Sequence, residues 1–473
     1  MKSRIAIPLT GFIAIIGILF LSAFRKQTGT ESPYPDEKVT YGSTGKQESS
    51  KGPLSLSTSF ENDFYTTSNR IGHFYAEVNS QQYTSNRNQV RLPLNLSVVI
   101  DRSGSMAGDK IRNARQAAKH IVDNMGPEDH LSIVIYDSQI DVLQPAVRVT
   151  NKQSIKNLID RITDRGGTNL MGGALKGYEE VRKFYNPTYV NRVLLLSDGL
   201  ANEGITSPTE IERIVRNKIK ENGISISTFG VGNDYNEDLM TAMAENGSGN
   251  YYFISNPQDV AGIFQKELNG LMDVLAQRTE LKITLPDEVN VEKVFGYRFE
   301  QTGRVLTIRF HDVMAGETKG VLVRYRVRNG VNLPLRFTSS LSFIEPETGR
   351  QQRMNQENRC EFTTDYYTYN RSFSEWVASQ VTLYESNERL EMAMKEVDKG
   401  NYQEARKIVQ ENNEYIKQKS HLVSKSPELQ KVESTNASYD SQIKDVEAMP
   451  AEEIKYMQKA TKSTNYQLRN KKR

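Results

Sequence analysis

Short, continuous apolar runs alternate with amphipathic stretches between Leu94 and Gln277. Such runs are typical of parallel strands covered on both faces, and the stretches between them repeat apolar residues at helical spacing. The predicted strands are 94–101, 131–136, 190–197, 224–231 and 251–254. The predicted helices are 109–124, 154–164, 169–184, 208–221, 236–245 and 258–277. This alternation predicts an α/β domain over 94–278, with a Rossmann-like, open, mainly parallel sheet and helices on both faces.

The pattern changes after Thr279, where apolar and polar residues alternate. The alternating runs are 281–285, 305–310, 321–327 and 335–343. A period of two is typical of half-buried antiparallel strands, so the sequence predicts a β-sandwich-like domain over 279–366.

Helical spacing returns over 367–424, where two apolar stripes flank Gly400-Asn401-Tyr402. The stripes consist of Trp376, Val377, Val381, Tyr384, Met394 and Val397, then Ala405, Ile408 and Val409. We expect a helical hairpin packed on the β domain. The alternative is a tetratricopeptide-like unit, but such units need neighbouring repeats to bury their core. Residues 425–473 are polar, which predicts a helical or disordered tail. We expect its basic end, 469–473, to be solvated.

The N-terminal 26 residues predict a membrane anchor or a signal peptide, because 5–24 is apolar except for Thr10 and Ser22 and is long enough to cross a bilayer. Leu21-Ser22-Ala23 is a poor cleavage site, which favours an uncleaved single-pass anchor. Lys2 and Arg4 favour a cytoplasmic N-terminus, with the bulk in the periplasm or at the cell surface; cleavage would make the protein secreted.

Two further segments precede the α/β domain. Residues 27–59 are rich in Ser, Thr, Gly, Lys and Glu and contain Pro33 and Pro35, which predicts a disordered linker. Residues 60–93 contain more Tyr, Phe and Val, with a strand expected at 73–78, and are interpreted as a β segment leading into the next domain.

Composition excludes several classes of site. The net charge of +3, from 61 Lys+Arg and 58 Asp+Glu, is too small to produce an electrostatic field that attracts nucleic acid strongly. The single cysteine, Cys360, rules out an intrachain disulfide and a Cys-rich zinc module. The five histidines are scattered without the short spacings of catalytic zinc sites.

Asp101-Arg102-Ser103-Gly104-Ser105 follows the first predicted strand directly. Ligands bind at the carboxyl ends of strands in open α/β sheets, and carboxylate and hydroxyl oxygens suit Mg²⁺, Mn²⁺ or Ca²⁺. Alone the pattern is weak, because similar loops commonly cap helices. Thr168, in 164–168, and Asp198, at the end of strand 190–197, add a third hydroxyl and a second carboxylate at the same expected edge.

This D-x-S-x-S, Thr and Asp set resembles the metal-ion-dependent adhesion site of the von Willebrand factor A family at all five positions. The resemblance implies that Ser103, Ser105 and Thr168 contact the metal directly. It also implies that Asp101 and Asp198 hold the metal mainly through water, and that an open position takes a Glu or Asp of a protein partner. Met106 is either a core residue at the start of the next helix or a residue that contacts the partner. Asn202 and Glu203 either border the metal-binding face or form a turn before the following helix. None of the three is assigned a metal role.

The last helix, 258–277, feeds into the β domain. In relatives such as integrins, movement of the corresponding helix couples to metal-face affinity, and we expect the same coupling here. The β region, with Met314-Ala315-Gly316-Glu317, and the helical tail resemble bacterial membrane-anchored A-domain proteins and, remotely, inter-alpha-trypsin inhibitor heavy chains.

We therefore predict a membrane-tethered, metal-dependent protein-binding module for adhesion or assembly in the cell envelope, and not an enzyme. One alternative is a magnesium-dependent hydrolase with Asp101 or Ser103 as nucleophile. It is disfavoured because the motif loops contain no histidine or lysine and the chain has no phosphate-binding loop. The other is an envelope chaperone or scaffold that acts through the helical hairpin.

Overall fold

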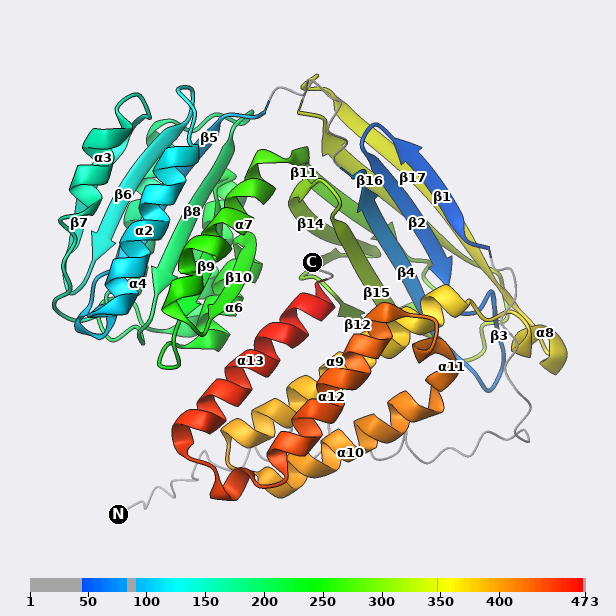
Figure 1. The fold of residues 1–473 in the computed structure, drawn as a ribbon. Coiled ribbons are helices and arrows are strands. Elements are labelled where there is room, and N and C mark those ends of the chain that lie inside the picture. Colours follow the sequence, from blue (N-terminus) through cyan, green and yellow to red (C-terminus); the bar gives the residue numbers. More distant parts are fainter. Residues whose placement is uncertain (1–44, 83–90, 347, 471–473) are drawn as a thin grey trace, which may run out of the picture.

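The computed structural model describes residues 45–82, 91–346 and 348–470, which form three packed units (Figure 1). The predicted membrane segment, 5–24, lies outside these ranges. Of the helices within them, none combines the length and apolar character needed to span a membrane.

The first unit contains a six-stranded sheet in the order β10-β9-β8-β5-β6-β7. Its strands are β5 (Leu94–Asp101), β6 (His130–Tyr136), β7 (Ile140–Arg148), β8 (Val190–Ser197), β9 (Ser225–Val231) and β10 (Ser248–Ile254). All neighbours are parallel except β7, which runs antiparallel to β6. Strand β7 was not predicted, because this edge strand is only partly buried and contains Pro145, so it has no continuous apolar run.

Helices cover both faces of this sheet, and the predicted fold class is confirmed (Figure 1). One face packs against α2 (Asp109–Asn124), α3 (Lys152–Ile159) and α7 (Val260–Met272). The other packs against α4 (Leu170–Lys183), α5 (Pro208–Asn222) and α6 (Glu237–Asn246). The last helix is shorter than predicted, since β11 begins at Val274. Four consecutive buried residues there, 274–277, do not distinguish helix from strand by period.

The second unit is a β-sandwich. One sheet has the order β1-β2-β4-β15-β12, with bounds Gln47–Lys51, Leu54–Phe60, Ile71–Ser80, Thr318–Val327 and Val289–Phe295. The other has the order β13-β14-β11-β16-β17-β3, with bounds Glu300–Thr302, Val305–Met314, Val274–Thr284, Leu335–Ile344, Gln351–Phe362 and Phe64–Tyr65. Rings of Phe60, Phe74 and Phe337 meet between the sheets. Because β1–β4 precede β5 and β11–β17 follow α7, the α/β unit is inserted into the sandwich.

Two sequence interpretations were wrong here. Within the expected linker, 27–59, residues 47–51 and 54–59 belong to strands β1 and β2. Residues 60–80 are likewise part of the sandwich and not a separate lead-in, although the strand expected at 73–78 lies within β4. The polar composition suggested disorder, but hydroxyl groups in this sheet are buried and form hydrogen bonds. Thr58 Oγ1, for example, lies 2.6 Å from Gln356 Oε1 and 2.7 Å from Asn358 Oδ1.

The third unit is helical, with α8 (Tyr366–Asn370), α9 (Glu375–Asp398), α10 (Tyr402–Gln418), α11 (Ser420–Val423), α12 (Pro427–Ile443) and α13 (Ala451–Arg469). The hairpin of α9 and α10 is present, but α12 and α13 pack beside it (Figure 1). The described end of the chain is therefore not a solvated tail: Arg469 forms ion pairs with Glu245 and Glu391. Polar pairs inside the bundle, such as Asn412 and Asn436 at 2.8 Å, hide this packing from a hydropathy pattern.

Candidate metal centre

Three loops meet at the carboxyl edge of the α/β sheet: 101–105 after β5, 164–168 between α3 and α4, and 198–204 after β8. Backbone hydrogen bonds join them. Gly104 N–H donates to Gly166 O at 3.1 Å, and Asn202 N–H donates to Thr168 O at 3.2 Å. The middle loop therefore holds the other two in place.

The predicted hydroxyls and carboxylates converge on this edge. Ser103 Oγ lies 3.1 Å from Ser105 Oγ, which donates to Asp198 Oδ1 at 2.8 Å. A Cβ atom built on Gly199 would lie 3.2 Å from Thr168 Oγ1 and 3.5 Å from Ser105 Oγ. The side chains of Ser105 and Thr168 therefore face one small space, which the glycine keeps open.

Asp101 lies behind the serines. Its Oδ1 accepts the Ser103 N–H at 2.8 Å, and its Oδ2 accepts the Ser197 hydroxyl at 2.7 Å. Asp101 and Asp198 are both 0% exposed. Burial raises the pKa of Asp101 to about 6, although hydrogen bonds from Ser197 and Ser103 act in the opposite direction.

This donor set fits a hard divalent cation. Three neutral hydroxyls and two buried carboxylates supply oxygen atoms, and a nearby cation offsets the cost of burying two negative charges. Ser105 is exposed while Ser103 and Thr168 are buried, so the space opens to solvent on the Ser105 side.

Two residues support the site: one was not identified from the sequence, and the other, Asn202, was left there without a role. Asp137, just after β6, forms ion pairs with Arg102 at 2.8 Å and with Arg165 at 2.9 Å, which ties the first two loops together. Asn202 Oδ1 accepts the Thr168 N–H at 2.9 Å, so this residue positions the threonine. Each of the motif loops 101–105 and 164–168 contains an arginine. This shared feature of the sequence could have indicated an acidic residue that pairs with both.

The structure also resolves two nearby features. Met106 is 0% exposed and belongs to the core, which decides between its two interpretations. Lys110, on α2, donates to Asp198 Oδ2 at 2.5 Å. The motif loops contain no lysine, as the sequence shows, and Lys110 reaches the site from the neighbouring helix.

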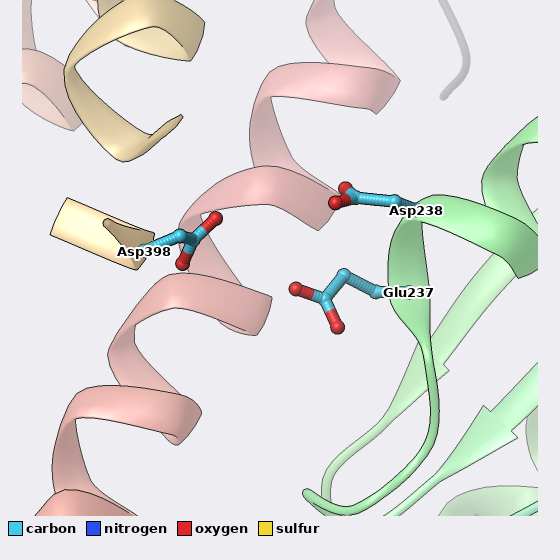
Figure 2. Close-up of side chains that lie close together, drawn as sticks. All are labelled: Glu237, Asp238 and Asp398. Atoms are coloured by element: carbon cyan, nitrogen blue, oxygen red, sulfur yellow. The ribbon is translucent and has the colours of Figure 1, made fainter. Parts of the chain in front are cut away.

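A second group of carboxylates lies between α6 and the helical unit. Figure 2 shows Glu237 and Asp238 from α6 facing Asp398 from α9, and one oxygen of each lies within 4.8 Å of the others. Lys462 Nζ lies 2.7 Å from Glu237 Oε1, 2.7 Å from Asp398 Oδ2 and 3.5 Å from Asp238 Oδ1, and Lys459 also contacts Glu237. Two ammonium groups thus already offset most of the negative charge of this cluster, which joins two units of the fold.

Residues 95–266 match the family model described as von Willebrand factor type A domain. These residues form a von Willebrand factor type A domain. Domains of this family commonly act as protein-interaction modules. This match confirms the resemblance to the family, and residues 95–266 are called the A domain below.

Two curated relatives share this region. The uncharacterized protein YfbK of Escherichia coli is 32% identical over 226 residues, covering 47% of this chain and 39% of that protein. Rat inter-alpha-trypsin inhibitor heavy chain H3 is 32% identical over 161 residues, covering 32% of this chain and 18% of that protein. The chain thus matches well under half the length of either relative.

Two solved structures share more of the fold. A von Willebrand factor type A protein from Catenulispora acidiphila aligns with a TM-score of 0.65 and 15% identity, covering 82% of this chain and 91% of that one. The ArnB paralog VWA2 from Sulfolobus acidocaldarius aligns with a TM-score of 0.60 and 16% identity, covering 89% and 99%. At these identities the likeness concerns the fold, and it extends beyond the A domain.

Proposed function

We propose that the A domain binds a divalent cation, Mg²⁺ or else Mn²⁺ or Ca²⁺, and uses it to bind a Glu or Asp side chain of a protein partner. The observation that carries this proposal is the convergence of three hydroxyls from two separate loops beside two buried carboxylates. The space opens to solvent at Ser105, where an incoming side chain has access.

The five residues divide into two roles. Ser103, Ser105 and Thr168 would contact the cation with neutral oxygens, whereas Asp101 and Asp198 would hold it mainly through water. Neutral direct ligands leave much of the positive charge uncompensated. The bound cation supplies that charge and an open coordination position, which together favour an anionic oxygen from a partner.

We propose a binding role and not catalysis. Lys110 is the basic group that the structure adds to the site, and it donates to the Asp198 carboxylate. A general base would have to accept a proton from a serine hydroxyl, and a lysine held as an ammonium on a buried carboxylate is poorly placed for that.

The proposed location is the cell envelope, with residues 5–24 as anchor and the described residues outside the cytoplasm. Hydropathy of the segment supports an anchor, and Lys2 and Arg4 support its orientation. Coupling between the metal face and the sandwich is also proposed, because α7 ends at Met272 and β11 begins at Val274.

Partner capture tests the proposal. Full-length wild type and Asp101→Ala would each be used as bait on solubilised native membranes, with Mg²⁺ and with chelator. Asp109→Ala, which removes an exposed acid paired with Arg112, is the matched control. We expect partners that are lost with Asp101→Ala and with chelator but kept by the control. Partners that survive both treatments would contradict the proposal, as would phosphoester hydrolysis that depends on Asp101.

A further inference from the structure

Lys110 places a positive charge on one carboxylate of the proposed metal centre. It lies in the first turn of α2, and its ammonium donates to Asp198 Oδ2 at 2.5 Å. Asp198 is 0% exposed, whereas the side chain of Lys110 keeps 24% exposure. The lysine therefore reaches from solvent to a buried anionic group.

The two buried carboxylates of the site are compensated differently. Asp101 accepts hydrogen bonds from neutral groups, the Ser103 amide and the Ser197 hydroxyl. Among the described residues, Lys110 is the cationic side chain that pairs with either carboxylate. The two arginines of the motif loops, Arg102 and Arg165, are paired with Asp137 and Asp141 instead. Charge compensation inside the site thus depends on a single lysine.

We propose that Lys110 is a tethered counter-cation that competes with the divalent ion for Asp198. This inference rests on the proposed metal binding and adds how its affinity is set. Two cations that share one carboxylate repel each other. Binding of the ion therefore requires either that the ammonium moves away or that the repulsion makes the binding free energy less favourable. Lys110 therefore stabilises the ion-free site and weakens ion binding.

The surroundings leave room for such a movement. A Cβ atom built on Gly232 would lie 3.5 Å from Lys110 Cε and 3.6 Å from its Nζ. Gly232 has no side chain to close this side, and the lysine is already partly in solvent. On the side of Gly232, the ammonium therefore meets no side chain that it would have to displace on leaving Asp198.

Two measurements on the full chain test the proposal: Mg²⁺ affinity by calorimetric titration and the melting temperature without ion. Lys110→Met removes the charge but keeps an unbranched side chain of similar length. Lys119→Met is the matched control, because it lies on the same helix and pairs with Asp160 away from the site. Lys110→Arg retains the positive charge, and Lys110→Gln is a second neutral variant should the methionine variant fold poorly.

We expect Lys110→Met to melt at a lower temperature without ion and to bind Mg²⁺ at least about tenfold more tightly than wild type. Lys110→Arg and Lys119→Met should stay within about twofold of wild type. If wild type binds Mg²⁺ and both neutral variants bind it equally or more weakly, Lys110 is only structural and this inference is wrong. If no variant, wild type included, binds a divalent ion, the proposed function itself fails.

Discussion

The Ser105 hydroxyl donates to the Asp198 carboxylate at 2.8 Å, although the two residues are 93 positions apart in the chain. They meet because β5 and β8 are parallel neighbours, with Ile100 paired to Leu196, so that the loops after both strands leave the sheet at the same edge. The contact joins the first and last parts of the predicted motif.

Removal of this hydroxyl should weaken ion binding far more than folding. We expect Ser105→Ala to lower Mg²⁺ affinity by at least about 100-fold, because it removes a direct ligand and the hydrogen bond to Asp198. Ser105 is exposed, so the free energy of unfolding should change by less than about 1 kcal/mol. Calorimetric titration and urea unfolding check both values, with the exposed Ser207→Ala as control; an unchanged affinity would exclude Ser105 as a ligand.

Asn202 should act through Thr168. Its side-chain oxygen accepts the Thr168 N–H at 2.9 Å, which orients the loop that carries the third hydroxyl. We expect Asn202→Ala to weaken Mg²⁺ binding by about tenfold, the usual effect of losing a group that orients a ligand. The exposed Asn157→Ala on α3 serves as control; equal affinities of both variants and wild type would contradict a positioning role.

Glu237 makes the contact between α6 and α13 sensitive to acid. Burial opposes its ionisation, but Lys462 and Lys459 outweigh that effect and lower its pKa to about 2 from 4.5. A lowered pKa in the folded state stabilises the protein above about pH 4.5, and this contribution is lost as the pH falls towards 2.

We therefore expect Glu237→Gln to reduce the free energy of unfolding at pH 7 by roughly 3 kcal/mol. The difference from wild type should shrink steadily below pH 4.5. Chemical unfolding of both proteins across pH 3–7 measures it, with the exposed Glu179→Gln, paired with Lys176, as control. A difference that does not depend on pH would show that the ion pairs contribute nothing.

Tyr466 should stabilise the A domain as well as the helical unit. This α13 residue is 5% exposed and belongs to the apolar core on the α4–α6 face of the sheet, with its ring 5.6 Å from that of Tyr251. We expect Tyr466→Ala to cost about 3–5 kcal/mol of unfolding free energy. Tyr456→Ala on the same helix is 49% exposed and should cost less than about 1 kcal/mol. Equal losses for the two variants would contradict the packing described for α13.

The A domain could be predicted closely because its central strands are buried on both faces. The predicted strands 94–101 and 190–197 coincide with β5 and β8 in full. The same reasoning failed where burial is polar. Strand β2 buries Ser57, Thr58 and Ser59 beside apolar residues, and α12 buries Asn436. Hydropathy scores such segments as solvated, because it does not register hydrogen bonds made inside the fold.

The site was predictable to the extent that it follows strand ends. Asp101 ends β5, the two serines follow it directly, and Asp198 follows β8, so the parallel sheet sets the position of four of the five residues. Thr168 lies instead between α3 and α4. Lys110 and Asn202 were not assigned because their roles depend on the direction of one side chain each, from a helix and from a turn. No spacing rule gives that direction before the loops are placed in space.

The most direct test of the metal centre is a Mn²⁺ titration followed by electron paramagnetic resonance, on wild type and on Thr168→Ala. Thr168 is the ligand proposed on the middle loop, so its removal tests whether the three loops act on one ion. We expect wild type to remove one equivalent of the free Mn²⁺ signal and Thr168→Ala to remove little at the same concentrations. A wild type that leaves the free signal unchanged, or a variant that binds as tightly as wild type, would contradict the proposed centre.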